Sequence, residues 1–236
     1  MGHLVIGVPS KGRLQQQTIE LLSAAGIAVE KRGNDRTYQG FASGAVEAEV
    51  KFLSASEITT HLANGSIHLG VTGEDLLREN LDNADAITKV LQPLGFGFAD
   101  VVVAVPEFWH DVVTMADLND VAATFRSRHG RRMRIATKYW TITQRFFTGN
   151  GIDRYRIVES LGATEGAPAS GSADIIVDIT TTGETLRANG LRVLEDGVML
   201  RSQAMLIQSK TAPTDDAQQT KIETVSALLR QAVAER

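Results

Sequence analysis

Short apolar runs alternate with helix-like patterns along most of the chain, and this alternation limits the folds open to it. Residues 101–105 are continuously apolar and end at Pro106, which is typical of a strand buried on both faces. After Ser10-Lys11-Gly12-Arg13, apolar residues instead recur at helical spacing from Leu14 to Ala25. Strand and helix patterns that alternate in this way predict an α/β protein, built from βαβ units around parallel sheet.

Three further expectations concern single elements. Ser56 is expected to cap a short helix that Asn64-Gly65 ends. Residues 198–207 are expected to form one strand, and residues 220–233 an amphipathic helix.

Composition excludes several classes of function. The 236 residues carry a formal net charge of −4, which disfavours non-specific binding to nucleic-acid phosphates. The chain has no cysteine, so disulfides, thiolate catalysis and cysteine-ligated metals are excluded. No apolar run reaches the ~18 residues of a membrane span, and the first residues lack the charged region of a signal peptide. We therefore expect a cytoplasmic protein that binds neither nucleic acid nor a membrane.

The densest group of candidate functional residues follows the apolar residues 175–177. This predicted strand delivers Asp178 at its carboxyl end, where ligands bind in open α/β sheets. Hydroxyl and backbone N–H donors follow at a predicted helix start: Thr180, Thr181, Thr182, Gly183, Glu184 and Thr185. Such a loop is suited to a phosphate monoester, although threonines at this position can also merely cap a helix. The glycine and lysine spacing of a P-loop is missing.

The segment from Glu165 to Leu186 resembles the signature of the ATP phosphoribosyltransferase family, the first enzymes of histidine biosynthesis. The matching positions are Glu165, Gly171, Ala173, Ile176, Asp178, Ile179, Thr182, Gly183, Thr185 and Leu186. Residues 7–14, 70–77 and 134–139 also resemble segments of this family.

The resemblance implies a fold of two α/β lobes like those of type II periplasmic binding proteins, with the active site in the cleft between them. Residues 1–98 and 190–236 would form the first lobe. Residues 99–189 would form the second, which would bind phosphoribosyl pyrophosphate. The chain is similar to the short form of the family, which has no C-terminal regulatory domain.

The reaction implied is transfer of the phosphoribosyl group of phosphoribosyl pyrophosphate to N1 of the adenine of ATP, giving phosphoribosyl-ATP and pyrophosphate. By this resemblance, residues 180–185 would hold the 5-phosphate. Asp178, the candidate catalytic residue, would accept hydrogen bonds from the ribose and lie near developing positive charge. Mg²⁺ would bind mainly through the pyrophosphate, because no protein cluster has metal-ligand spacing.

The resemblance adds candidates for ATP or pyrophosphate binding near the amino terminus. They are Lys11, Gly12, Arg13, Arg36, Gly73, Glu74 and Asp75. Two alternatives stay open: Lys11 and Arg13 could be solvated surface cations, and Asp75 could only cap its helix. Many family members have an arginine in the region where this chain has Ser54.

Short-form members work with a separate regulatory subunit related to histidyl-tRNA synthetases. The resemblance therefore implies a homodimer that assembles with such a partner. Two other classes remain as alternatives: a solute-binding module of the same fold, and a catalytically silent subunit of a larger complex.

Overall fold

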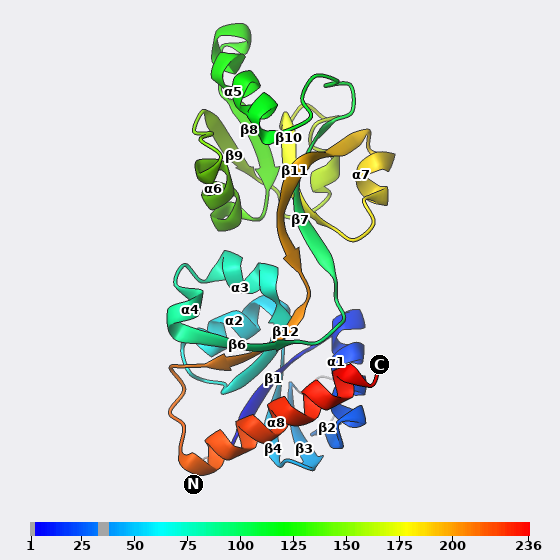
Figure 1. Cartoon of the computed structure of the whole chain (residues 1–236), viewed down its shortest axis with the longest axis vertical. Coiled ribbons are helices and arrows are strands. Elements are labelled where there is room, and N and C mark those ends of the chain that lie inside the picture. The colour runs from blue at the N-terminus through cyan, green and yellow to red at the C-terminus, as the bar shows by residue number, and fades with distance from the viewer. Residues whose placement is uncertain (1–2, 33–37) are drawn as a thin grey trace. The chain divides into compact units, whose positions relative to one another are not determined.

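The computed structural model describes residues 3–32 and 38–236, and it divides the chain into two compact units (Figure 1). Unit 1 comprises Met1–Phe98 and Gln203–Arg236, and unit 2 comprises Ala99–Ser202. Each unit has a sheet of its own. The return to unit 1 expected at residue 190 is wrong, because the strand that starts at Leu191 pairs with a strand of unit 2 up to Ser202.

Unit 1 is built on a seven-stranded sheet in the order β2-β3-β4-β1-β5-β12-β6. Its strands are β1 (Val5–Pro9), β2 (Ile27–Lys31), β3 (Gln39–Gly44), β4 (Ala48–Leu53), β5 (Leu69–Gly73), β6 (Thr88–Pro93) and β12 (Ala204–Ser209). Its helices are α1 (Gly12–Ala24), α2 (Ala55–Ala63), α3 (Glu74–Asn80), α4 (Ala84–Ile87) and α8 (Asp216–Ala234). The central strands β4, β1 and β5 are parallel neighbours, and they place three helix starts at one sheet edge.

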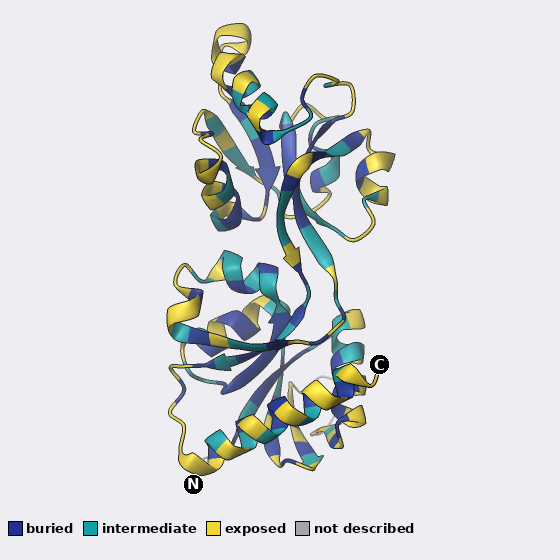
Figure 2. Ribbon diagram, in the orientation of Figure 1, coloured by how far each residue is buried: buried dark blue, intermediate teal, exposed yellow. Residues whose placement is uncertain are grey.

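Helices cover both faces of this sheet, and each face has its own buried cluster (Figure 2). On one face Leu21 of α1 and Val225 of α8 pack against the sheet, and on the other Ile58 of α2 and Leu77 of α3 do so. Among the elements of the described residues, the 19-residue α8 is the longest, and its outer face is exposed. Within the described part of the chain, no helix is both long and apolar enough to cross a bilayer.

Unit 2 is built on a five-stranded sheet in the order β11-β7-β10-β8-β9. Its elements are β7 (Ala99–Pro106), α5 (Met115–His129), β8 (Met133–Thr137), α6 (Trp140–Gly149), β9 (Tyr155–Glu159), the short 3₁₀ helix η1 (Thr164–Gly166), β10 (Ile175–Thr180), α7 (Glu184–Ala188) and β11 (Leu191–Ser202). Apolar residues of α5 and α6 pack on one face of the sheet, and Leu186 of α7 packs on the other.

Three sequence expectations need correction. The sheets are mixed, because β7 and β11 in unit 2, and β12 in unit 1, pair with antiparallel neighbours. The single strand expected at residues 198–207 is two strands in different sheets, since the chain leaves one unit at Ser202 and enters the other at Gln203. The cap of α2 is Ser54, two positions before the expected Ser56; its hydroxyl accepts from the Glu57 N–H at 3.3 Å.

Candidate functional site

A hollow of about 310 Å³ lies in unit 2 at the carboxyl end of β10. It is lined by Ala99, Glu165, Asp178, Ile179, Thr180, Thr181, Thr182, Thr185 and Leu186. Asp178 alternates with Val177, which faces the core under α5 and α6, so its side chain lies on the opposite face with Ile176 and Leu186. The strand period and the start of α7 thus bring Asp178 and four threonines of the sequence prediction into one hollow.

Hydrogen bonds within the loop fix its shape. The Gly183 N–H donates to the Thr180 Oγ1 at 2.9 Å, and the Glu184 N–H donates to the Thr182 Oγ1 at 3.4 Å. Gly183 has a φ of 70°, in the left-handed region that favours glycine. A hydroxyl that accepts an N–H can still donate its own proton to a ligand. Capping and anion binding are therefore compatible roles for Thr180 and Thr182.

The helix that follows the loop contributes less to anion binding than the sequence suggested. The helix α7 has only 5 residues, so its macrodipole is small. Thr181, Thr182, Glu184 and Thr185 are exposed. Hydroxyl groups and backbone N–H groups, and not a long helix dipole, are what this loop offers to an anion.

Asp178 lies in an environment that opposes its ionisation. Partial burial raises the pKa of its carboxyl, and the nearby Glu165 carboxylate raises the same pKa further. The Ile179 N–H, which donates to Asp178 Oδ1 at 2.8 Å, and the positive charge of Lys138 act on this pKa in the opposite direction. The carboxylate is thus held where a positive charge on a ligand would stabilise it.

Two neighbours of Asp178 had no role in the sequence prediction. Glu165 of η1 lines the hollow. It is the first position of the segment that resembles the family signature, but it has no role in the sequence prediction. Lys138 follows β8, whose Ala136 pairs with Ile176 of β10, and it is exposed. The register of two parallel strands explains why Lys138 acts on Asp178. Neither local spacing nor composition shows that register.

Glu165→Gln should lower the pKa of Asp178, because it removes a negative charge that disfavours the second carboxylate. Lys138→Met should raise the same pKa, because it removes a cation that favours ionisation. Titration of the Asp178 carboxyl carbon by NMR measures both shifts. Glu107→Gln, an exposed change outside the hollow, is the control and should leave the titration unchanged. Shifts of equal sign in Glu165→Gln and Lys138→Met would contradict this electrostatic account.

The candidates of unit 1 meet at one edge of its sheet. Lys11 is the N-cap of α1 after β1, and Gly73 is the N-cap of α3 after β5. The two strands are parallel neighbours, so both turns lie at their carboxyl ends. Lys11, Gly12 and Arg13 are exposed. The structure thus brings both predicted turns to the same edge.

The acidic residues of the second turn are already engaged. The Glu74 carboxylate lies 3.4 Å from Arg78 Nη2. The backbone N–H of Glu74 donates to the backbone carbonyl of Gln203 at 3.2 Å. Asp75 is buried in the first turn of α3, where Gly73 and not Asp75 is the cap residue. Asp75 is thus not the N-cap residue of this helix, and its place at the border of the nucleotide stays a prediction.

Two other sequence observations have different outcomes. Ser54 forms a capping box with Glu57, whose carboxylate accepts from the Ser54 N–H at 2.8 Å. The serine at the position of the family arginine therefore has a structural task. Arg36 lies outside the described residues. Across residues 3–32 and 38–236, no three His, Asp or Glu side chains gather closely enough to hold a metal ion.

Comparison with known proteins gives concordant results. The family model of ATP phosphoribosyltransferase (HisG) matches residues 54–231. The ATP phosphoribosyltransferase of Mesorhizobium japonicum is 60% identical over 212 residues, which are 89% of this chain and 91% of that protein. That of Brucella suis is 57% identical over 228 residues, 96% of this chain and 97% of that protein.

Solved structures resemble the fold at lower identity. The ATP phosphoribosyl transferase (HisG:HisZ) complex from Thermotoga maritima matches with a TM-score of 0.72 and 23% identity, over 98% of both chains. An extracellular-binding protein of a probable amino-acid ABC transporter of Bacillus subtilis matches with a TM-score of 0.52 and 11% identity, over 98% of this chain and 92% of that one. The expected α/β fold of the type II periplasmic-binding-protein kind is confirmed.

Proposed function

The chain belongs to the ATP phosphoribosyltransferase family, and from that membership we propose how its residues perform the reaction. The reaction is transfer of the phosphoribosyl group of phosphoribosyl pyrophosphate to N1 of the adenine of ATP, the first step of histidine biosynthesis. The observation that carries the assignment of roles is the hollow at the end of β10, where the partly buried carboxylates of Asp178 and Glu165 line the same space as four threonines.

The threonine loop is proposed to hold the 5-phosphate of phosphoribosyl pyrophosphate. The hydroxyls of Thr180 and Thr182 accept from loop N–H groups, and this orients them to donate outward. Gly183 brings the backbone close without a side chain. Thr181, Glu184 and Thr185 complete the loop, with Thr181 and Thr185 lining the hollow. A phosphate fixed at one end of the ribose positions C1′ for attack at the other.

Asp178 is proposed to accept hydrogen bonds from the ribose hydroxyls and to stabilise positive charge as it develops on the ring. N1 of adenine supplies the electron pair for the new bond to C1′, and the pyrophosphate oxygen leaves with the old pair. A carboxylate whose ionisation is disfavoured in the free protein gains most from such a charge, because the charge offsets its desolvation.

The unit 1 candidates are proposed to bind the phosphates of ATP or the leaving pyrophosphate. Lys11 and Arg13 are exposed cations that flank Gly12, whose φ of 75° opens the turn. Arg36 is proposed for the same task, and Gly73, Glu74 and Asp75 for the border of the nucleotide. Mg²⁺ is proposed to bind mainly through the pyrophosphate oxygens, which are the hard ligands it prefers.

Pyrophosphate should be released when the protein is mixed with ATP, phosphoribosyl pyrophosphate and Mg²⁺. A coupled phosphate assay measures the release, and mass spectrometry of the nucleotide identifies phosphoribosyl-ATP. Omission of ATP is the control, because hydrolysis of the sugar substrate alone would also release pyrophosphate. Tight binding of a small anion without turnover would favour the alternative of a solute-binding module, because an extracellular-binding protein has a similar fold.

We expect a homodimer in the cytoplasm that assembles with a histidyl-tRNA-synthetase-like regulatory subunit. The fold likeness to a chain of the HisG:HisZ complex from Thermotoga maritima supports this proposal. The purified chain alone should be active and should lose little activity when histidine is added, because allosteric inhibition needs a second site that biases the catalytic state. A histidine titration, with and without the partner, measures this. Strong inhibition of the chain alone would contradict it.

A further inference from the structure

A second hollow of unit 2 is lined largely by arginines. It has a volume of about 330 Å³ and is lined by Arg131, Arg132, Arg134, Tyr155 and Arg156. These residues lie at the amino ends of β8 and β9 or just before them. Because β8, β9 and β10 are parallel, this edge of the sheet is opposite to the edge that carries Asp178. The hollow is therefore separate from the candidate site of the reaction.

The strand register places two of the arginines side by side. Arg134 of β8 pairs with Arg156 of the edge strand β9. Met133 and Ile135, the chain neighbours of Arg134, are buried in the core under α5 and α6, so alternation directs Arg134 to the other face. Like charges on adjacent strands disfavour the fold unless a counter-charge lies nearby.

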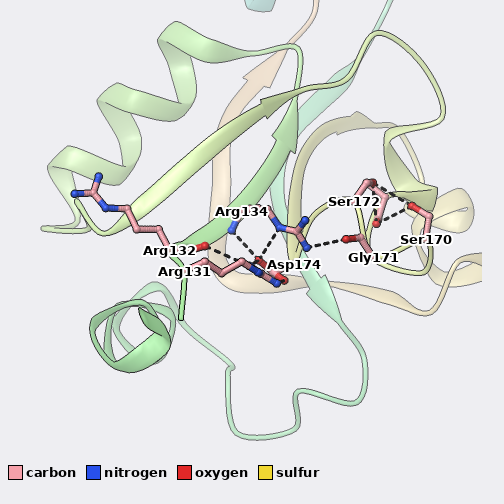
Figure 3. A network of polar contacts seen from close by, with 8 residues as sticks. Arg131, Arg132, Arg134, Ser170, Gly171, Ser172 and Asp174 are labelled. Atoms are coloured by element: carbon pink, nitrogen blue, oxygen red, sulfur yellow. Dashed lines mark hydrogen bonds and ion pairs between the residues drawn. The ribbon is translucent and has the colours of Figure 1, made fainter. Parts of the chain in front are cut away.

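A single carboxylate, that of Asp174, supplies the counter-charge (Figure 3). Its two oxygens accept from Arg131 Nη1 at 2.6 Å and Nη2 at 2.7 Å. It also accepts from the Arg134 N–H at 2.8 Å. Although partial burial of Asp174 acts in the opposite direction, these hydrogen bonds hold its pKa below the usual value. Arg131 thus forms a two-pronged ion pair with both oxygens of the Asp174 carboxylate.

The remaining guanidinium groups have donors to spare. Arg134 Nη2 donates to the Gly171 carbonyl at 2.7 Å, but Arg134 Nε is buried without a hydrogen-bond partner and lies 3.5 Å from Asp174 Oδ2. No ion pair involves Arg132 or Arg156 anywhere in the described ranges 3–32 and 38–236. Four arginines thus line the hollow, and the Asp174 carboxylate forms ion pairs with two of them, Arg131 and Arg134.

We propose that this hollow binds a pyrophosphate or triphosphate group. Guanidinium groups donate pairs of parallel hydrogen bonds that match phosphate oxygens, and an anion of several charges offsets the surplus of positive charge. The volume suits an oligophosphate and lies at the small end of ligand sites. Free pyrophosphate and the phosphate chain of a nucleotide share this chemistry. The proposal does not depend on the proposed reaction, because none of these residues takes part in it.

Calorimetry of the full chain with sodium pyrophosphate, at constant ionic strength, tests the site. We expect Arg156→Gln and Arg132→Gln each to weaken one binding event roughly tenfold or more, since each removes charged donors. Arg128→Gln is the matched control: it removes an exposed arginine of the same unit that does not line the hollow, and it should change little. Arg132 and Arg156 are both exposed, and the use of two variants keeps the proposal falsifiable if one variant fails to fold.

The same titration with ATP distinguishes the sources. If ATP competes with pyrophosphate for the binding event that Arg156→Gln weakens, the site takes the phosphate chain of a nucleotide. If ATP does not compete, the site takes free pyrophosphate. Pyrophosphate binding that is equal in the wild type, Arg156→Gln and Arg132→Gln overturns the proposal, as does an equal loss in Arg128→Gln. Both variants should keep the release of pyrophosphate from substrates, so failure here is distinguishable from failure of the proposed reaction.

Discussion

Gly183→Pro should abolish measurable binding of phosphoribosyl pyrophosphate. Gly183 has a φ of 70°, whereas the proline ring fixes φ near −65°, so the loop cannot keep its shape. Proline also removes the N–H that donates to Thr180 Oγ1 at 2.9 Å. An incompatible proline costs about 3 kcal/mol, which corresponds to a loss in affinity of roughly 100-fold or more. Calorimetry with the sugar substrate measures the loss.

A pair of alanine variants separates loop function from backbone strain. Gly130 ends α5 with a φ of 70° and a ψ of 2°, and Gly183 begins α7 with a φ of 70° and a ψ of 3°. The backbone strain of alanine should therefore be similar at each, about 1–2 kcal/mol, although at Gly183 the added Cβ also lies 3.0 Å from the flexible end of Arg187, which must move aside. Only Gly183→Ala should weaken substrate binding. If both variants bind phosphoribosyl pyrophosphate equally well, the 5-phosphate binds elsewhere.

Asp178→Asn should lower kcat/KM by roughly 10- to 100-fold. The carboxylate accepts charge-assisted hydrogen bonds from ribose in the proposed mechanism, and loss of the charge costs about 1.5–3 kcal/mol. The initial rate of pyrophosphate release, measured below saturation, reports this change. Turnover close to that of the wild type would remove Asp178 from the mechanism.

The stability of the same variant provides the control. Because burial raises the pKa of Asp178 in the folded protein, the folded state favours the protonated form. This contribution to stability is fully present below the unfolded pKa and is lost as pH rises through the raised folded pKa. Asparagine stays neutral, so Asp178→Asn should be at least as stable as the wild type near pH 7. Urea unfolding at that pH checks whether a lower rate reflects chemistry or an unfolded protein.

Local patterns were enough to predict the central part of the candidate site. The apolar residues 175–177, the carboxylate that follows them and the hydroxyl-rich turn are consecutive in sequence, and the structure brings Asp178 and the threonines into one hollow. The fold class followed from the alternation of strands and helices. The roles of these residues in the reaction stay predictions until the variants are measured.

Contacts between distant segments could not be predicted in this way. Strand order depends on which strands pair, and the strand-like pattern of residues 198–207 gives no sign that it serves two sheets. The neighbours Glu165 and Lys138 act on Asp178 only because η1 and β8 lie beside β10. The helix α5, in contrast, had a usable local signal: Thr114 and Asp117 form a capping box before buried residues at helical spacing.

The position of β12 has a consequence for synthesis of the protein on the ribosome. This strand lies between β5 and β6, yet it is made after all of unit 2. Unit 2 is one continuous stretch and can close its core while the last residues are still in the exit tunnel. Until β12 is made, β5 and β6 of unit 1 each have an unpaired edge, and these edges are open to pairing with other chains. The newborn chain is therefore most exposed to aggregation in its first half, and chaperones that bind nascent chains should contact that half until translation ends.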